Sequence, residues 1–210
     1  MKTNYELRYA AHPKDAKNYD TARLREDFLI QNLFVDNEVN MVYSMYDRLI
    51  VGGAKPVGET LVLEAIDPLK ATHFLSRREI GIFNVGGAGR VKVDGKTFDL
   101  DFKEALYLGC GDRTVSFESV DAAKPAKFYF NSAPAHRTCP AKKVTKADAI
   151  VAEMGSLEGS NHRNINKMLV CQVVETCQLQ MGMTELQPGS IWNTMPAHTH
   201  SRRMEDYFYF

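Results

Sequence analysis

Two histidines near the C-terminal end of the chain have the spacing of metal ligands. His198 and His200 stand two residues apart in "PAHTHSRRME", so in an extended segment both imidazoles point to the same face. Glu205 follows five residues after His200. Because it lies an odd number of residues from both histidines, it can reach the same ion only if the chain turns or bulges between them. This ligand set suits zinc, manganese, iron or nickel and does not choose among them.

A pair of surface histidines beside a turn is the alternative interpretation of an isolated His-x-His motif. Here Pro188-Gly189 predicts a turn upstream of the pair, and strand-like sequence lies on both sides. Together with the glutamate, this context favours a metal site.

The elements that must position these ligands are predominantly strands. The segments "VNMVYSMYDRLIVGGA" and "REIGIFNVGGAGRVKVDGKTFDL" are rich in β-branched and aromatic residues. Asp94-Gly95 lies between two such runs and predicts a two-residue hairpin. Many short strands with closely spaced turns indicate an all-β sandwich or barrel.

Short helices are predicted at two places. In "DTARLREDFLIQN", Asp20 or Thr21 is a suitable N-cap, and Leu24 and Phe28 form an apolar pair one turn apart. The segment "TKADAIVAEM" predicts a second short helix, opened by Thr145.

A polar connection, "SLEGSNHRNINKM", separates two strand-rich regions. We therefore divide the chain near residue 145, into an N-terminal β unit (1–145) and the first part of a second unit (146–210). A short internal repeat supports this division, because "SRREIGIFNVGG" and "SRRMEDYFYF" share Ser-Arg-Arg, a glutamate and a strand-like aromatic run.

The repeat also allows the metal-ligand positions of the two units to be compared. Superposing Glu79 on Glu205 places Thr72 and Phe74 at the positions of the two histidines. The comparison predicts that the first unit has the scaffold without the metal.

The bulk composition excludes several classes of partner. The chain has 210 residues, 44% of them hydrophobic, and 26 basic side chains balance 26 acidic ones. No net field therefore attracts nucleic acid or a membrane surface. The N-terminal segment lacks the apolar run of a signal peptide, which predicts a cytoplasmic protein. Its cysteines, which show no metal-ligand spacing and are expected to be reduced, are Cys110, Cys139, Cys171 and Cys177.

The segment "PGSIWNTMPAHTHSRRME" resembles the first motif of the cupin superfamily: a Pro-Gly turn, His-x-His and then a glutamate. Its spacing from Gly189 to His198 is longer than in most cupins. Further segments in consistent order, including "FLSRREIGIFNVGGAGRVKVDG", "PAKFYFNSAPAH", "ETCQLQMGMTEL" and "WNTMPAHTHSRRMEDYFYF", are similar to the 4-deoxy-L-threo-5-hexosulose-uronate ketol-isomerase family. This resemblance extends over nearly the whole chain.

The resemblance implies a fold, a cofactor and an assembly. It implies a two-cupin architecture of double β-barrel or jelly-roll type, one zinc ion in the second cupin, and a cytoplasmic homohexamer that takes a uronate substrate. His198, His200 and Glu205 match three of the family's zinc ligands, whereas the fourth, a later histidine, is absent from this sequence. We therefore expect the second cupin to be incomplete, with "YFYF" as an exposed edge strand.

The implied reaction needs a general base and a group that binds the substrate carboxylate. An aldose–ketose isomerisation moves a proton between neighbouring carbons, so a base must carry it. Glu185 and Glu175, in the strand-like segment before the histidines, are candidates, although a structural role suits each equally well. The candidate carboxylate-binding residues are Arg163, Arg202 and Arg203. Gln178, Gln180 and Thr184 share one face of the same predicted strand and are further candidates to line the pocket.

Two other functions remain open at this stage. An iron-dependent cupin dioxygenase would use the same three ligands. A cupin fragment that only binds a sugar acid, or that is purely structural, would catalyse no reaction.

Overall fold

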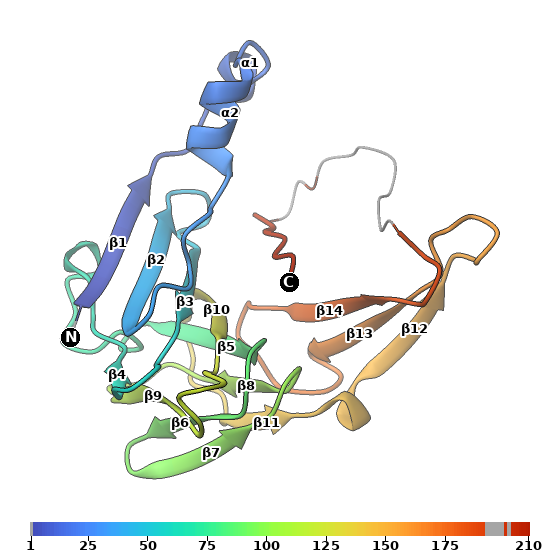
Figure 1. Ribbon diagram of the computed structural model, residues 1–210. Coiled ribbons are helices and arrows are strands. Elements are labelled where there is room, and N and C mark those ends of the chain that lie inside the picture. Colours follow the sequence, from blue (N-terminus) through green and yellow to red (C-terminus); the bar gives the residue numbers. More distant parts are fainter. Residues whose placement is uncertain (1, 192–199, 201–202) are drawn as a thin grey trace.

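The computed structural model describes residues 2–191, 200 and 203–210, which form a predominantly β structure (Figure 1). The strands are β1 (Lys2–Arg8), β2 (Glu38–Ser44), β3 (Ile50–Ala54), β4 (Leu61–Val62), β5 (Arg78–Asn84), β6 (Gly89–Val93), β7 (Lys96–Leu100), β8 (Ala105–Leu108), β9 (Val115–Ser119), β10 (Phe128–Pro134), β11 (Lys142–Val144), β12 (Ile150–Met154), β13 (Arg163–Leu169) and β14 (Met181–Leu186). The helices are α1 (Pro13–Ala16) and α2 (Thr21–Phe28), with 3-10 turns η1 (Asp67–Leu69) and η2 (Lys146–Asp148). The all-β prediction is confirmed.

Within the described residues the strands form three sheets. A seven-stranded sheet has the order β1-β2-β3-β10-β5-β8-β11, and a four-stranded sheet has the order β4-β9-β6-β7. The third sheet, β12-β13-β14, begins after the predicted division near residue 145. Neighbouring strands are antiparallel except β1 and β2, which are parallel. No sheet closes into a barrel in the described part of the chain, and the open, layered arrangement agrees with a cupin-type jelly roll.

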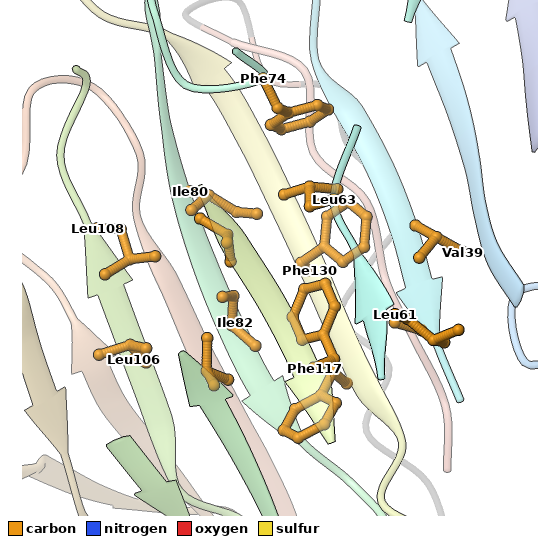
Figure 2. Close-up of a cluster of buried hydrophobic side chains, with 14 of the residues drawn as sticks. Val39, Leu61, Leu63, Phe74, Ile80, Ile82, Leu106, Leu108, Phe117 and Phe130 are labelled. Carbon is orange, nitrogen blue, oxygen red and sulfur yellow. The ribbon is translucent and has the colours of Figure 1, made fainter. Parts of the chain in front are cut away.

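The seven-stranded sheet is the central layer, because side chains on both of its faces are buried. Toward the four-stranded sheet, Ile80 and Ile82 of β5 pack in one hydrophobic cluster with Phe117 of β9 and Phe130 of β10 (Figure 2). Every residue of β5 is buried. A strand covered on both faces shows a continuous apolar run rather than alternation, as "REIGIF" does.

The opposite face of the central sheet packs against the second unit. Phe83 of β5 belongs to a second cluster with Leu169 at the end of β13 and Met181 at the start of β14. A Cβ atom at Gly81 would lie 2.4 Å from Met181 Sδ and 2.7 Å from Leu169 Cδ1. The absence of a side chain at Gly81 therefore lets the two units approach closely.

The turn predictions agree with the backbone. Asp94 and Gly95 join β6 to β7 with φ angles of 50° and 83°, as a two-residue hairpin of the primed type requires. After β14, Gly189 has a φ angle of 89°, and Ser190 N–H donates a 2.9 Å hydrogen bond to the Gln187 carbonyl. Both predicted turns are confirmed.

The helix predictions were half right. Asp20 caps α2 through a 2.8 Å hydrogen bond from Arg23 N–H, as predicted. The second predicted helix is wrong, because only the turn η2 forms before the chain extends into β12. Thr145 and Asp148 make a reciprocal capping box that closes this single turn, and β12 then pairs with β13. Among the described residues, no helix is long and apolar enough to cross a membrane.

The predicted edge strand at the C-terminal end is also wrong. Residues 203–210 have no regular secondary structure. The Phe208 ring packs instead on the first unit: it stacks on Tyr129 and meets Phe34 edge-on, with centroids 4.6 Å and 5.6 Å away. In this segment, packing of the Phe208 ring on Tyr129 of β10 thus takes the place of the predicted strand pairing.

Candidate metal centre

His200 and Glu205 lie together in the C-terminal segment. His200 Nδ1 is 3.0 Å from Glu205 Oε1, and the Tyr207 hydroxyl donates a 3.0 Å hydrogen bond to Glu205 Oε2. Five residues of straight strand would span about 16 Å, so this contact agrees with the turn or bulge expected from the odd spacing. An imidazole nitrogen and a carboxylate oxygen this close fit a divalent metal, because both are ligands of zinc and iron.

The third predicted ligand, His198, lies outside the described residues, as does Arg202. In the part of the chain that the structure describes, no group of three or more His, Cys, Asp and Glu side chains is arranged to hold a metal ion. The described part therefore supplies two of the three predicted ligands, and His198 stays a prediction from the sequence.

Asp206 ties the C-terminal segment to the central sheet. The Tyr129 hydroxyl donates a hydrogen bond to Asp206 Oδ2, and Asn131 Nδ2 donates one of 2.6 Å to Oδ1. Burial raises the pKa of Asp206, although these two hydrogen bonds partly offset the effect. Because both donors belong to β10, they hold the neighbouring Glu205 segment against the first unit.

A cavity of about 1600 Å³ lies beside the His200–Glu205 pair. Its wall includes Arg48 from the loop before β3 and Glu185 from β14. It also includes Gln178, Gln180 and Thr184, as predicted, but the shared strand face is wrong, because β14 begins at Met181, after both glutamines. The candidate metal ligands therefore open onto a space large enough for a sugar acid.

Arg203 is a well-placed candidate for binding a carboxylate in this cavity. Its Nη1 donates a 2.7 Å hydrogen bond to Gln178 Oε1. Gln178 Nε2 in turn donates a 2.7 Å hydrogen bond to the Pro134 carbonyl, so the amide is held from both ends. Arg203 and Arg48 are both cavity-lining guanidinium groups.

Arg163 has a different environment. It is the first residue of β13, is only 6% exposed, and donates a 2.9 Å hydrogen bond from Nη1 to the Asn161 carbonyl. Its buried Nε has no hydrogen-bond partner among the described residues. The residues that line the cavity, as far as the structure describes them, do not include Arg163.

Both predicted bases are in ion pairs. Glu185 Oε1 lies 2.8 Å from Lys103 Nζ, and its Oε2 lies 2.6 Å from Lys146 Nζ. Burial alone would raise the pKa of Glu185, but the hydrogen bonds and charges of the two lysines together lower it. Glu175 pairs with Arg137 and, unlike Glu185, is not among the described cavity-lining residues.

Sequence reasoning missed the structural importance of Glu79, which is fully buried in β5. Its Oε2 accepts hydrogen bonds from the Tyr107 hydroxyl and Cys177 N–H, at 2.6 and 2.7 Å. Its Oε1 accepts two more, both of 2.6 Å, from the N–H groups of Gln178 and Leu179. The first unit thus fixes the backbone of the cavity wall. The internal repeat was the one signal that pointed to this position.

Comparison with known proteins places the chain in a family. Residues 28–210 match the KduI/IolB family. A Bacteroides thetaiotaomicron relative named 4-deoxy-L-threo-5-hexosulose-uronate ketol-isomerase 1 is 77% identical over 210 residues, 100% of this chain and 75% of the relative. A Formosa agariphila relative with the same enzyme name, without the numeral, is 56% identical over 209 residues, 100% of this chain and 75% of its own length. A solved IolB-like protein from Salmonella typhimurium LT2 matches at 17% identity and a TM-score of 0.46, over 61% of this chain and 46% of that one. The chain therefore belongs to the KduI/IolB family.

Proposed function

We propose that this chain is a metal-dependent ketol-isomerase that converts 4-deoxy-L-threo-5-hexosulose uronate to 3-deoxy-D-glycero-2,5-hexodiulosonate. The observation that carries the proposal is the 77% identity to a relative of that name along all 210 residues. The geometric support is the His200–Glu205 pair on the wall of a cavity of sugar-acid size.

The donor set of the C-terminal segment fits a zinc ion. His198, His200 and Glu205 would hold it, leaving a coordination position open as catalytic zinc sites do. When bound, the ion would supply Lewis acidity toward the oxygens at C1 and C2 of the open-chain sugar. Tyr207, by donating to Glu205 Oε2, leaves Oε1 on the side of His200 and fixes the orientation of the carboxylate.

The substrate carboxylate has a natural partner in Arg203. A guanidinium group binds a carboxylate through two parallel hydrogen bonds, and this fixes the direction of the sugar chain. Gln178 holds Arg203 Nη1 in place, which leaves other N–H groups of the guanidinium available. Arg48 provides a second positive charge on the same cavity wall.

Proton transfer from C2 to C1 requires a base beside the sugar. Of the two predicted candidates, Glu185 is the better placed, because it lines the cavity. Its two lysine partners lower its pKa, which makes the carboxylate a weaker base. Glu185 in the role of base therefore requires a substrate that displaces one of the lysines.

Elemental analysis of the purified chain, together with an isomerase assay, tests this proposal. We expect about one zinc per chain, with the metal lost in His198→Ala and in His200→Ala, because each variant removes one of three protein ligands. His162→Ala is the matched control, since His162 pairs with Glu153 and is not among the described cavity-lining residues. The control should keep both metal and activity.

The assay should be run with and without oxygen. Turnover that is independent of oxygen and lost with the metal supports the isomerase. Turnover that requires oxygen and iron would replace it with a dioxygenase, and a chain that holds no metal and isomerises nothing would refute the proposal.

We further propose, on the family resemblance, that the chain assembles as a homohexamer in the cytoplasm. Light scattering during size-exclusion chromatography should then give a mass near six times that of the 23.7-kDa chain. Cell fractionation tests the location.

A further inference from the structure

Cys177 and His136 form a second pair of reactive side chains, separate from the candidate metal ligands. Cys177 Sγ lies 3.2 Å from His136 Nδ1, although the two residues are 41 positions apart. The backbone N–H of His136 also donates a hydrogen bond of 3.4 Å to the same sulfur. Cys177 lines the cavity, so its thiol is accessible from the space in which the sugar acid is proposed to bind.

The fold anchors the Cys177 side of this pair. His136 lies two residues after the end of β10 at Pro134, and Cys177 lies four residues before β14 begins at Met181. The Cys177 N–H is anchored by its 2.7 Å hydrogen bond to the buried Glu79 carboxylate. The backbone at Cys177 is therefore fixed by a buried carboxylate, and this anchor holds the sulfur beside the imidazole.

A charged side chain, Arg137, lies next to this pair. Arg137 adjoins His136, and its pKa is raised first by a hydrogen bond to Glu175 and further by electrostatic interaction with Cys139 and Cys177. The thiolate is the nucleophilic form of a cysteine, and an imidazole in contact with a thiol can take its proton.

The other cysteines lack this combination. Cys110 and Cys139 are buried, and burial raises the pKa of Cys139. Cys171 is exposed, and its sulfur lies 4.0 Å from the Gln180 amide nitrogen. Cys171 also lines the cavity and has no imidazole contact among the described residues, so it is an internal reference for an accessible thiol.

We propose that Cys177 and His136 form a nucleophilic thiol–imidazole site that captures small molecules with an electrophilic carbonyl carbon. His136 takes the thiol proton, and the sulfur bonds to the carbonyl carbon as the π bond to oxygen breaks. The resulting alkoxide then receives the proton from the imidazolium, which gives a hemithioacetal. No electron is gained or lost, and the reverse steps release the aldehyde or ketone.

Alkylation by iodoacetamide, followed by peptide mass spectrometry, measures the reactivity of each thiol in the whole chain. Here the sulfur–carbon bond forms, iodide leaves and the thiol proton passes through His136 to solvent. We expect Cys177 to react about tenfold or more faster than Cys171. His136→Ala should bring Cys177 close to the rate of Cys171, whereas His162→Ala, the matched control, should leave it unchanged.

Competition with methylglyoxal tests the carbonyl chemistry directly. Methylglyoxal should slow alkylation of Cys177 while leaving that of Cys171 nearly constant, and removing the methylglyoxal should restore the rate. Equal rates at the two cysteines in the wild-type chain would overturn the proposal, and so would the absence of protection. The wild-type comparison decides the question even if His136→Ala fails to fold. Because neither readout requires turnover of a sugar acid, the result is independent of the proposed isomerase activity.

Discussion

Glu79→Gln gives the sharpest test of how the two units are joined. The carboxylate of Glu79 accepts four hydrogen bonds, two at each oxygen. Three of these come from consecutive backbone N–H groups in residues 177–179, which form part of the cavity wall. The substitution changes one oxygen to an amide group and keeps the size of the side chain.

The expected loss in free energy of unfolding follows from what happens to each of the four hydrogen-bond donors. The amide will face Tyr107, because a hydroxyl can rotate to accept a hydrogen bond whereas a backbone N–H cannot. The N–H of Cys177 then loses its acceptor in a buried site, which costs about 1–3 kcal/mol. The two remaining bonds, to Gln178 and Leu179, become neutral and lose roughly half of their strength. We expect the free energy of unfolding to fall by about 3 kcal/mol in total.

Urea denaturation and hydrogen exchange measure the two parts of this effect. The urea midpoint should fall in proportion to the loss in free energy of unfolding. The amide of Cys177 should lose more protection from hydrogen exchange than other amides of the second unit. Tyr107→Phe, which removes one donor, should cost about 2 kcal/mol, and the exposed Glu153→Gln less than about 0.5 kcal/mol. A Glu79→Gln variant within about 1 kcal/mol of the wild type would refute the reasoning.

Two further predictions concern an ion-pair cluster and a close-packed strand. Glu185→Gln should lower the free energy of unfolding by about 1 kcal/mol at neutral pH. The pKa of Glu185 is lowered from 4.5 in the folded chain, so its contribution to the free energy of unfolding is present above that value and is lost as the pH falls through the folded pKa. The urea midpoints of the wild type and of Glu185→Gln should therefore converge in acid. Gly52→Ala should destabilise the protein by about 2 kcal/mol, since the new Cβ would lie 2.2 Å from Phe130 Cζ. Gly58→Ala should leave the thermal midpoint nearly unchanged, because no atom of the described residues beyond its chain neighbours lies within 4 Å of the new Cβ. A loss equal to that at Gly52 would contradict the packing argument.

Local signals in the sequence predicted the local structure well. Asp94-Gly95 predicted its hairpin because only residues that tolerate positive φ angles fit both positions of the turn. The segment after Thr145 misled the prediction, because helix propensity favours "KADAIVAEM" whereas pairing with β13 decides its conformation. The final aromatic run misled it for the same reason, since packing on Tyr129 overrides a strand pattern.

Long-range contacts could not be predicted from patterns. Glu79 reads in the sequence as an ordinary strand residue, yet it binds the backbone of Cys177, 98 positions away. The contact between His136 and Cys177 joins residues 41 positions apart, and neither segment alone carries a signal for it. A spacing rule detects ligands that share one strand, whereas partners from separate strands require the fold.

These contacts make the N-terminal unit part of the candidate site. Glu79 fixes the wall before β14, Asp206 is held by two side chains of β10, and Asp47 accepts a 2.6 Å hydrogen bond from the N–H of Met204. Each contact joins the first unit to a segment that carries a candidate ligand or lines the cavity. A second unit cut away at residue 145 would lose all three contacts at once. The first unit, which contains none of the predicted metal ligands, is therefore the surface that holds Met204 and Asp206, the two neighbours of Glu205 in the chain.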